Sequence, residues 1–153
     1  MSTREHCYPE MLKACQRMLL AYDALIEDPE CHRDAWVRGY GCACLLCAAV
    51  GDRAGKQQYC EYVARVPDPR TCVTYCPLGF GFKLYSSCVP PCVYGGGAAQ
   101  TYLVLRNDLK DQVSSPTLIR AAKARRRFLV KKLRAAGIIV GRGRVCREQG
   151  KTP

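Results

Sequence analysis

Residues 114–137 read SSPTLIRAAKARRRFLVKKLRAAG, and this stretch carries helix signals at both ends. Ser115 can cap a helix, Pro116 suits its first position, and Gly137 suits the left-handed residue that follows its end. Alanine, leucine, lysine and arginine dominate the residues between these signals, and all four are strong helix formers. The stretch therefore predicts a helix over residues 115–136.

The predicted helix separates apolar from basic side chains. Its apolar residues recur at spacings of 4, 7, 4 and 3, which places on one side Leu118, Ala122, Leu129, Leu133 and Ala136. Its basic residues recur at spacings of 3, 4, 4 and 3 and form a second row of Arg120, Lys123, Arg127, Lys131 and Arg134. The charge is widened by Arg125, Arg126 and Lys132 and extended along a Gly-spaced, adaptable segment by Arg142 and Arg144.

Positive charge is concentrated around this helix. Residues 1–100 carry ten basic and ten acidic residues, whereas residues 101–153 carry fourteen and three, so the net charge of +11 lies in the last third. Like charges at this density repel each other within a helix, and an anionic partner would relieve that repulsion. We therefore expect these basic residues to bind the phosphate backbone of RNA or DNA with little sequence preference. The alternatives are an anionic membrane surface, a solvated charged face and a nuclear-import signal.

The sequence upstream of the basic segment divides into two parts. Residues 1–94 hold eleven of the twelve cysteines and both histidines, and we interpret them as a cysteine-rich body. Residues 95–113 begin with three glycines and are interpreted as a Gly-containing connector, because consecutive glycines cost the most backbone entropy to order. Residues 114–153 then form a basic helical arm and tail.

Residues 9–28 predict a first helix, which Asp28 and Pro29 end. Its apolar residues recur at helical spacing and comprise Met11, Cys15, Met18, Tyr22 and Leu25. We interpret Cys15 as a small buried hydrophobic residue rather than a metal ligand. The same row could instead serve self-association, because helix–helix seams have this spacing.

Eight of the other cysteines form two groups with the spacing of metal ligands, and Cys31 or His32 could complete the first group. One contains a C-x2-C pair, and the other contains two C-x3-C pairs separated by eleven residues. A tight pair lets two thiolates reach one tetrahedral zinc ion, and thiols stay reduced in the cytosol and nucleus. We therefore predict zinc as the cofactor, with the candidate ligands Cys42, Cys44, Cys47, Cys60, Cys72, Cys76, Cys88 and Cys92. Disulfides or buried thiols are the alternatives.

Neither a signal peptide nor a membrane span is expected. Charged and polar residues interrupt the apolar runs near the start, and the longest uncharged apolar stretch, residues 39–51, is shorter than the ~20 residues a bilayer crossing needs. This predicts a cytoplasmic or nuclear protein that is not secreted. We also predict that it is not an enzyme, because the sequence has no nucleotide-binding or HExxH motif and only two histidines.

The cysteine cluster, the arginine-rich residues 123–127 and the absence of a targeting signal resemble the small basic cysteine-rich accessory proteins of positive-strand plant RNA viruses. The resemblance implies binding of zinc and RNA, RNA rather than DNA, and suppression of host RNA silencing. The expected fold class is α+β: a small, zinc-stabilised cysteine-rich domain with an N-terminal helix, followed by a basic C-terminal helix. The alternative is a non-enzymatic protein- or membrane-interaction module whose cysteines lie in the core or form disulfides.

Overall fold

The structure is a computed structural model that describes residues 7–39, 46, 49–50, 53, 75–79, 96–141 and 144–147. Most of these residues belong to α-helices, namely α1 (Pro9–Glu27), α2 (Pro29–Gly39), α5 (Gly96–Lys110) and α6 (Ser115–Ala135). The other named elements are a short 3-10 helix, η2 (Pro77–Gly79), and two strands, β1 (Ile138–Gly141) and β2 (Arg144–Arg147).

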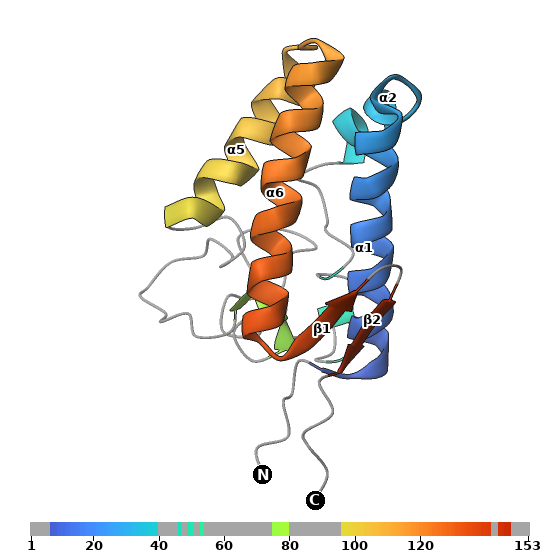
Figure 1. Ribbon diagram of the computed structural model, residues 1–153, viewed down its shortest axis with the longest axis vertical. Coiled ribbons are helices and arrows are strands. Elements are labelled where there is room, and N and C mark those ends of the chain that lie inside the picture. Colours follow the sequence, from blue (N-terminus) through green and yellow to red (C-terminus); the bar gives the residue numbers. More distant parts are fainter. Residues whose placement is uncertain are drawn as a thin grey trace, which may run out of the picture.

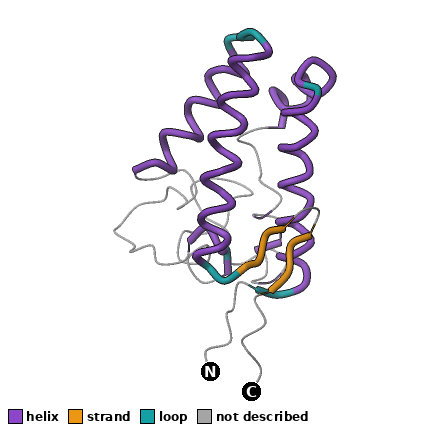
Figure 2. The backbone as a smooth tube through the Cα atoms, in the orientation of Figure 1, coloured by secondary structure: helices purple, strands orange, loops and turns teal. Residues whose placement is uncertain are grey.

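Helix α6 lies between α5 and α1 and packs against both (Figure 1). Both neighbours run antiparallel to α6, and α2 packs against all three helices at one end of the molecule. At the other end, β1 and β2 form an antiparallel hairpin in which Ile138 lies opposite Arg147 (Figure 2). Strand β1 packs against α6 and strand β2 against α1, so the hairpin closes this end of the helical layer.

The ends of α6 follow local sequence signals. The helix begins at Ser115, as predicted, but the N-cap residue is Ser114 and not Ser115. Gly137 has φ 86°, the left-handed conformation that the sequence predicted, and its N–H donates to the carbonyl oxygen of Arg134 at 2.9 Å. A residue with a side chain would be strained at this φ, so Gly137 sets the point at which the chain leaves the helix for β1.

The junction of α1 and α2 is also encoded locally. Helix α1 ends where the N–H of Asp28 donates to the carbonyl oxygen of Ala24 at 2.9 Å. Pro29 begins α2, where its missing N–H leaves no helical hydrogen bond unmade. The Asp28 carboxylate accepts a hydrogen bond from the backbone N–H of Cys31 at 3.2 Å and so caps α2. The predicted end of the first helix is confirmed, and the same two residues start the next one.

The core lies between α1, α5 and α6. All five residues of the apolar row of the first helix are buried, including Cys15, which is fully enclosed as expected. All five residues of the apolar row of α6 are buried as well. From α5, Leu105 and Leu109 complete the contact with α6. The apolar row of α1 is thus occupied by the protein's own core.

The described residues are mostly helical, with a single two-stranded sheet, which fits the predicted α+β class only weakly. The N-terminal helix and the basic C-terminal helix are both present. Most of segment 95–113, interpreted as a Gly-containing connector, forms α5, and Leu105 and Leu109 of this helix pack against α6. The expected basic arm likewise packs against the body, since α6 contacts α1.

Candidate nucleic-acid interface

The basic row predicted on α6 lies on the solvent side of the helix. The opposite side of α6 is buried against α1 and α5, which leaves a single face of the helix toward solvent. Five basic residues on that face are exposed: Arg120, Lys123, Arg127, Lys131 and Arg134. We call these five residues the cationic row. They share one side of the helix because their spacing of three and four residues follows the helical repeat.

Arg125 differs from the prediction because it is buried at the contact between α5 and α6, with only 4% of its surface exposed. Its Nη1 donates to the hydroxyl oxygen of Thr101 at 3.1 Å. Its guanidinium carbon also lies 5.5 Å from the ring centroids of both Tyr102 and Phe128. A cation over aromatic faces is attracted by the ring quadrupoles, so Arg125 holds α5 to α6 and is not displayed to a phosphate.

Arg126 and Lys132 lie at the edges of the exposed face. The guanidinium of Arg126 binds the carboxylate of Asp23 on α1, with its Nε 2.7 Å from Oδ1 and an Nη2 hydrogen bond of 3.3 Å to Oδ2. This two-point contact uses the planar fork of arginine and partly neutralises the charge of Arg126. Lys132 is half-buried. Arg142 and the side chain of Arg144 lie outside the described residues, although the backbone of Arg144 belongs to β2.

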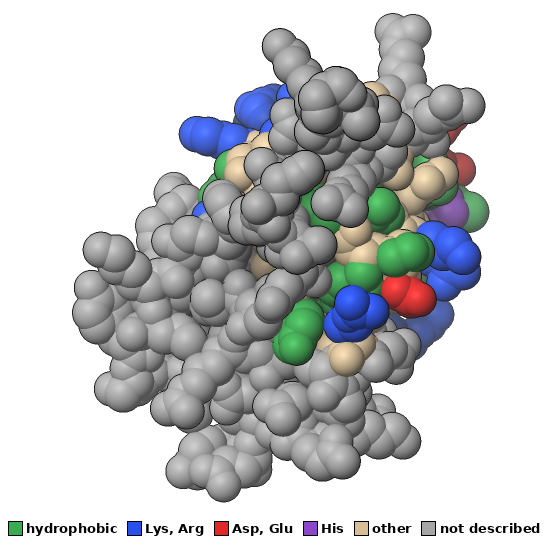
Figure 3. Space-filling model, turned by 90° about the horizontal axis from the view of Figure 1, so that it is seen from below, with side chains coloured by type: hydrophobic (Ala, Val, Ile, Leu, Met, Phe, Trp, Pro, Cys, Tyr) green, Lys and Arg blue, Asp and Glu red, His purple; other side chains and the backbone are tan. Residues whose placement is uncertain are grey.

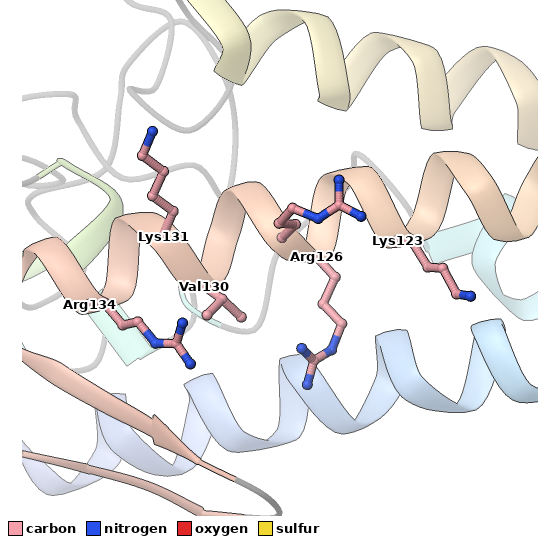
Figure 4. Close-up of a pocket in the computed structure, with 6 residues that line it drawn as sticks. Lys123, Arg126, Val130, Lys131 and Arg134 are labelled. Carbon is pink, nitrogen blue, oxygen red and sulfur yellow. The ribbon is translucent and has the colours of Figure 1, made fainter.

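An open hollow of about 480 Å³ runs along the exposed side of α6 (Figure 4). Every residue that lines it belongs to this helix: Lys123, Arg126, Arg127, Val130, Lys131 and Arg134. Arg126 and Arg134 point toward α1, whereas Lys131 points away from it (Figure 4). Five of the six lining side chains are therefore cationic, and the hollow has the charge that suits a phosphate-bearing ligand.

Two of the lining cations are held in place by neighbours. Arg126 is paired with Asp23, and the Nη2 of Arg134 donates to the carbonyl oxygen of Val140 on β1 at 3.1 Å. Within the described part of the chain, no carboxylate is paired with Lys123, Arg127 or Lys131. Their charge faces solvent, which makes these three side chains the best placed to bind an anion.

In the view from below, hydrophobic, basic and acidic side chains are interspersed on the part of the described surface that is visible (Figure 3). Sequence reasoning missed the role of Val130 in the hollow and the pairing of Asp23 with Arg126. The pairing has no local signal, because Asp23 lies 103 positions before Arg126.

The structure describes only one of the eight predicted zinc ligands, Cys76, whose thiol is buried in the core. The other seven, Cys42, Cys44, Cys47, Cys60, Cys72, Cys88 and Cys92, lie outside the described residues. Among the residues that are described, no three His, Cys, Asp or Glu side chains gather as metal ligands.

Near Cys76 lies Tyr8, whose hydroxyl donates to the carbonyl oxygen of Tyr75 at 3.3 Å. The guanidinium of Arg53 sits 5.1 Å from the centroid of the Tyr8 ring. Burial, followed by the nearby Cys76 thiol, raises the pKa of the Tyr8 hydroxyl well above its ordinary value. Tyr8 therefore stays protonated and acts as a hydrogen-bond donor in the core.

Comparison of the chain with protein-family models, with curated proteins and with solved structures found no match. No described helix is long and apolar enough to cross a membrane. The fold and the site define a small helical protein with one strongly cationic helix face.

Proposed function

We propose that the protein binds nucleic acid through the phosphate backbone, along the cationic row of α6, with little sequence preference. The observation that carries the proposal is the exposure of five basic side chains on one side of a helix whose other side is packed into the core. Such a row supplies the sequence-independent electrostatic contribution that dominates nonspecific binding. RNA is the proposed partner in preference to DNA, on the strength of the resemblance in sequence layout, which also implies suppression of RNA silencing.

The packing of α6 favours nucleic acid over an anionic membrane surface. An amphipathic helix binds a bilayer by inserting its apolar face among the lipids. In α6 that face is already buried against α1 and α5, so only the cationic row is presented outward. This arrangement favours a partner that binds by electrostatic attraction and not by insertion of an apolar helix face.

Zinc bound by the cysteine-rich body is part of the same proposal. The paired cysteine spacings support it. Metal would stabilise the body that supports α6, because metal binding contributes directly to folding free energy in small domains.

Charge reversal along the cationic row tests the proposal. The variant Lys123→Glu, Arg127→Glu, Lys131→Glu should lower RNA affinity several-fold or more and reduce the steepness of its salt dependence. Each phosphate contact contributes about −0.9 to the log–log salt slope on duplex and about −0.7 on single strands. Fluorescence anisotropy with a labelled RNA at several salt concentrations measures both quantities. Arg125 is left unchanged because its reversal would disturb the α5–α6 contact instead of testing binding.

The matched control reverses three exposed basic residues on other helices: Lys13→Glu on α1 and Arg106→Glu and Lys110→Glu on α5. Both variants change the net charge equally, so a difference between them isolates the position of the charge. Circular dichroism checks that each variant remains folded. Equal losses in the two variants, or unchanged binding in the first, would overturn the proposal.

A further inference from the structure

The position of α6 within the fold determines how a nucleic acid can approach it. Helix α6 is the middle member of a layer, with α5 on one side and α1 on the other (Figure 1). Arg125 faces Thr101 on α5, and Arg126 faces Asp23 on α1, so both flanks of α6 are occupied. The exposed face of α6 is thus bordered by a neighbouring helix along both edges.

A helix with a neighbouring helix packed along each side cannot enter a groove of a duplex, because the layer is wider than the groove. Packed helices lie about 8–10 Å apart, and each is about 10 Å across, so a three-helix layer is roughly 26–30 Å wide. The major groove of B-DNA is only about 12 Å wide, and that of duplex RNA is deep and narrower still. If α6 entered it, α1 and α5 would collide with the sugar-phosphate walls. Base edges at the floor of a duplex groove are therefore out of reach of the cationic row.

The row is also straight and long. Arg120 and Arg134 are separated by fourteen positions, or about 21 Å along the helix axis. The strands of a duplex wind around its axis, so a straight row meets phosphates only where a strand crosses it. A single strand is not held to the winding of a duplex and can bend to follow the whole row.

The hollow offers charge and a small apolar surface but no aromatic side chain. Its lining contains five cations and Val130. The nearest described aromatic residues on α5 and α6, Tyr102 and Phe128, are engaged with Arg125 on the α5 side of the helix. Bases therefore find no stacking platform among the residues that line the hollow, and phosphate groups are the part of a strand that it can recognise.

We propose that the hollow along α6 binds the backbone of a single nucleic-acid strand, with its phosphates on Lys123, Arg127 and Lys131 and its bases turned outward. This inference rests on the proposed function and deepens it by naming the strand form. It makes the protein a binder of unpaired RNA that is indifferent to base identity.

The experiment measures anisotropy for uridine and adenosine oligoribonucleotides of increasing length and for a duplex RNA, all at one salt concentration. We expect affinity to rise steeply with length until the strand spans the cationic row and more gently beyond that length. Affinity should be equal for the two bases and no weaker for single strands than for the duplex. The triple variant at positions 123, 127 and 131 should lose the single-strand binding, while the variant at positions 13, 106 and 110 keeps it.

The outcomes separate this inference from the proposed function. Binding that depends on the cationic row but is tighter for the duplex, or that discriminates between the bases, would overturn the single-strand site and leave nucleic-acid binding in place. Loss of any difference between the two charge-reversal variants on every RNA would overturn both.

Discussion

Among single residues, Glu30 makes the contacts that join the start of α2 to the start of α6. Its carboxylate accepts a hydrogen bond from the hydroxyl of Ser115 and pairs with Arg33 at 2.9 Å. Arg33 also donates to the carbonyl oxygen of Val113 in the turn before α6. The Ser115 hydroxyl, followed by the positive charge of Arg33, lowers the pKa of the Glu30 carboxyl below its ordinary range.

We predict that Ser115→Ala raises the pKa of Glu30 toward the ordinary glutamate range, as measured by NMR titration of its carboxyl. A lowered folded-state pKa stabilises the protein above the ordinary glutamate pKa, and that stability is lost as pH falls through the lowered value. The free energy of unfolding of Ser115→Ala should therefore decrease less than that of the unsubstituted protein as the pH is lowered through the acidic range. Ser114→Ala is the control, because the Ser114 hydroxyl pairs with Thr117. An unshifted Glu30 titration in Ser115→Ala would contradict the assignment.

Arg125 and Arg127 are neighbours on α6 whose surroundings predict opposite responses to the same substitution. Arg125→Ala should lower the free energy of unfolding by about 2–3 kcal/mol, because a buried charged hydrogen bond and two cation–π contacts are lost. Arg127→Ala should change it by less than about 0.5 kcal/mol, as is usual for an exposed residue. Urea denaturation measures both. Equal effects at the two positions would contradict the burial of Arg125.

Among the elements, α6 packs one face against its neighbours and presents the other face to solvent. Its apolar row is buried against α1 and α5, and its cationic row faces solvent over the same length. Repulsion within the row destabilises an isolated helix by a few tenths of a kcal/mol per pair. Packing of the apolar row outweighs that cost, because each buried leucine contributes about 1.5–3 kcal/mol. The body therefore holds a helix of like charges in place.

Two leucine-to-alanine variants test whether the packed face of α6 supplies stability independently of the exposed face. Leu133→Ala on α6 removes a fully buried side chain and should lower the free energy of unfolding by about 2–5 kcal/mol. Leu103→Ala on α5 should have an effect below about 0.5 kcal/mol, because Leu103 is 45% exposed. Urea denaturation followed by circular dichroism distinguishes them. RNA affinity of the folded Leu133→Ala protein should be unchanged, and a large loss would show that the two faces are not independent.

At the level of the whole molecule, the cysteines divide between the described core and the segments predicted to bind zinc. Cys7 and Cys15 are buried thiols packed around α1, and Cys76 joins them from the predicted ligand set. Elemental analysis of protein purified under reducing conditions, without added metal, should find one or more equivalents of zinc with all thiols reactive in denaturant. Absence of metal together with missing thiols would instead mean disulfides.

Cysteine variants test which cysteines bind the predicted zinc ion. Cys72→Ser together with Cys76→Ser should lower the zinc content and the melting temperature of the body. Cys15→Ser is the control for loss of a buried thiol, since Cys15 lies on the apolar row of α1. It should leave the zinc content unchanged. An unaltered zinc content in the double variant would remove these two cysteines from the predicted ligand set.

The sequence by itself determined the helices that carry the site. The end of α1 at Asp28 and Pro29, the left-handed Gly137 after α6 and the two rows of α6 could all be predicted. Capping, helix propensity and periodicity act within one or two turns, so their signals lie in neighbouring residues. The helix α5 was not predicted, because its stability comes from packing on α6 rather than from its glycine-rich start.

The tertiary structure decided which of the eight basic residues of α6 face solvent. Arg125 turns inward to Thr101, 24 positions away, and Arg126 turns to Asp23, 103 positions away. Distances this long along the chain leave no local pattern, and spacing alone places Arg125 and Arg127 in one charged run. Burial of a charge is decided by the partners that the fold brings to it, because a buried cation requires hydrogen bonds or aromatic faces to replace its water.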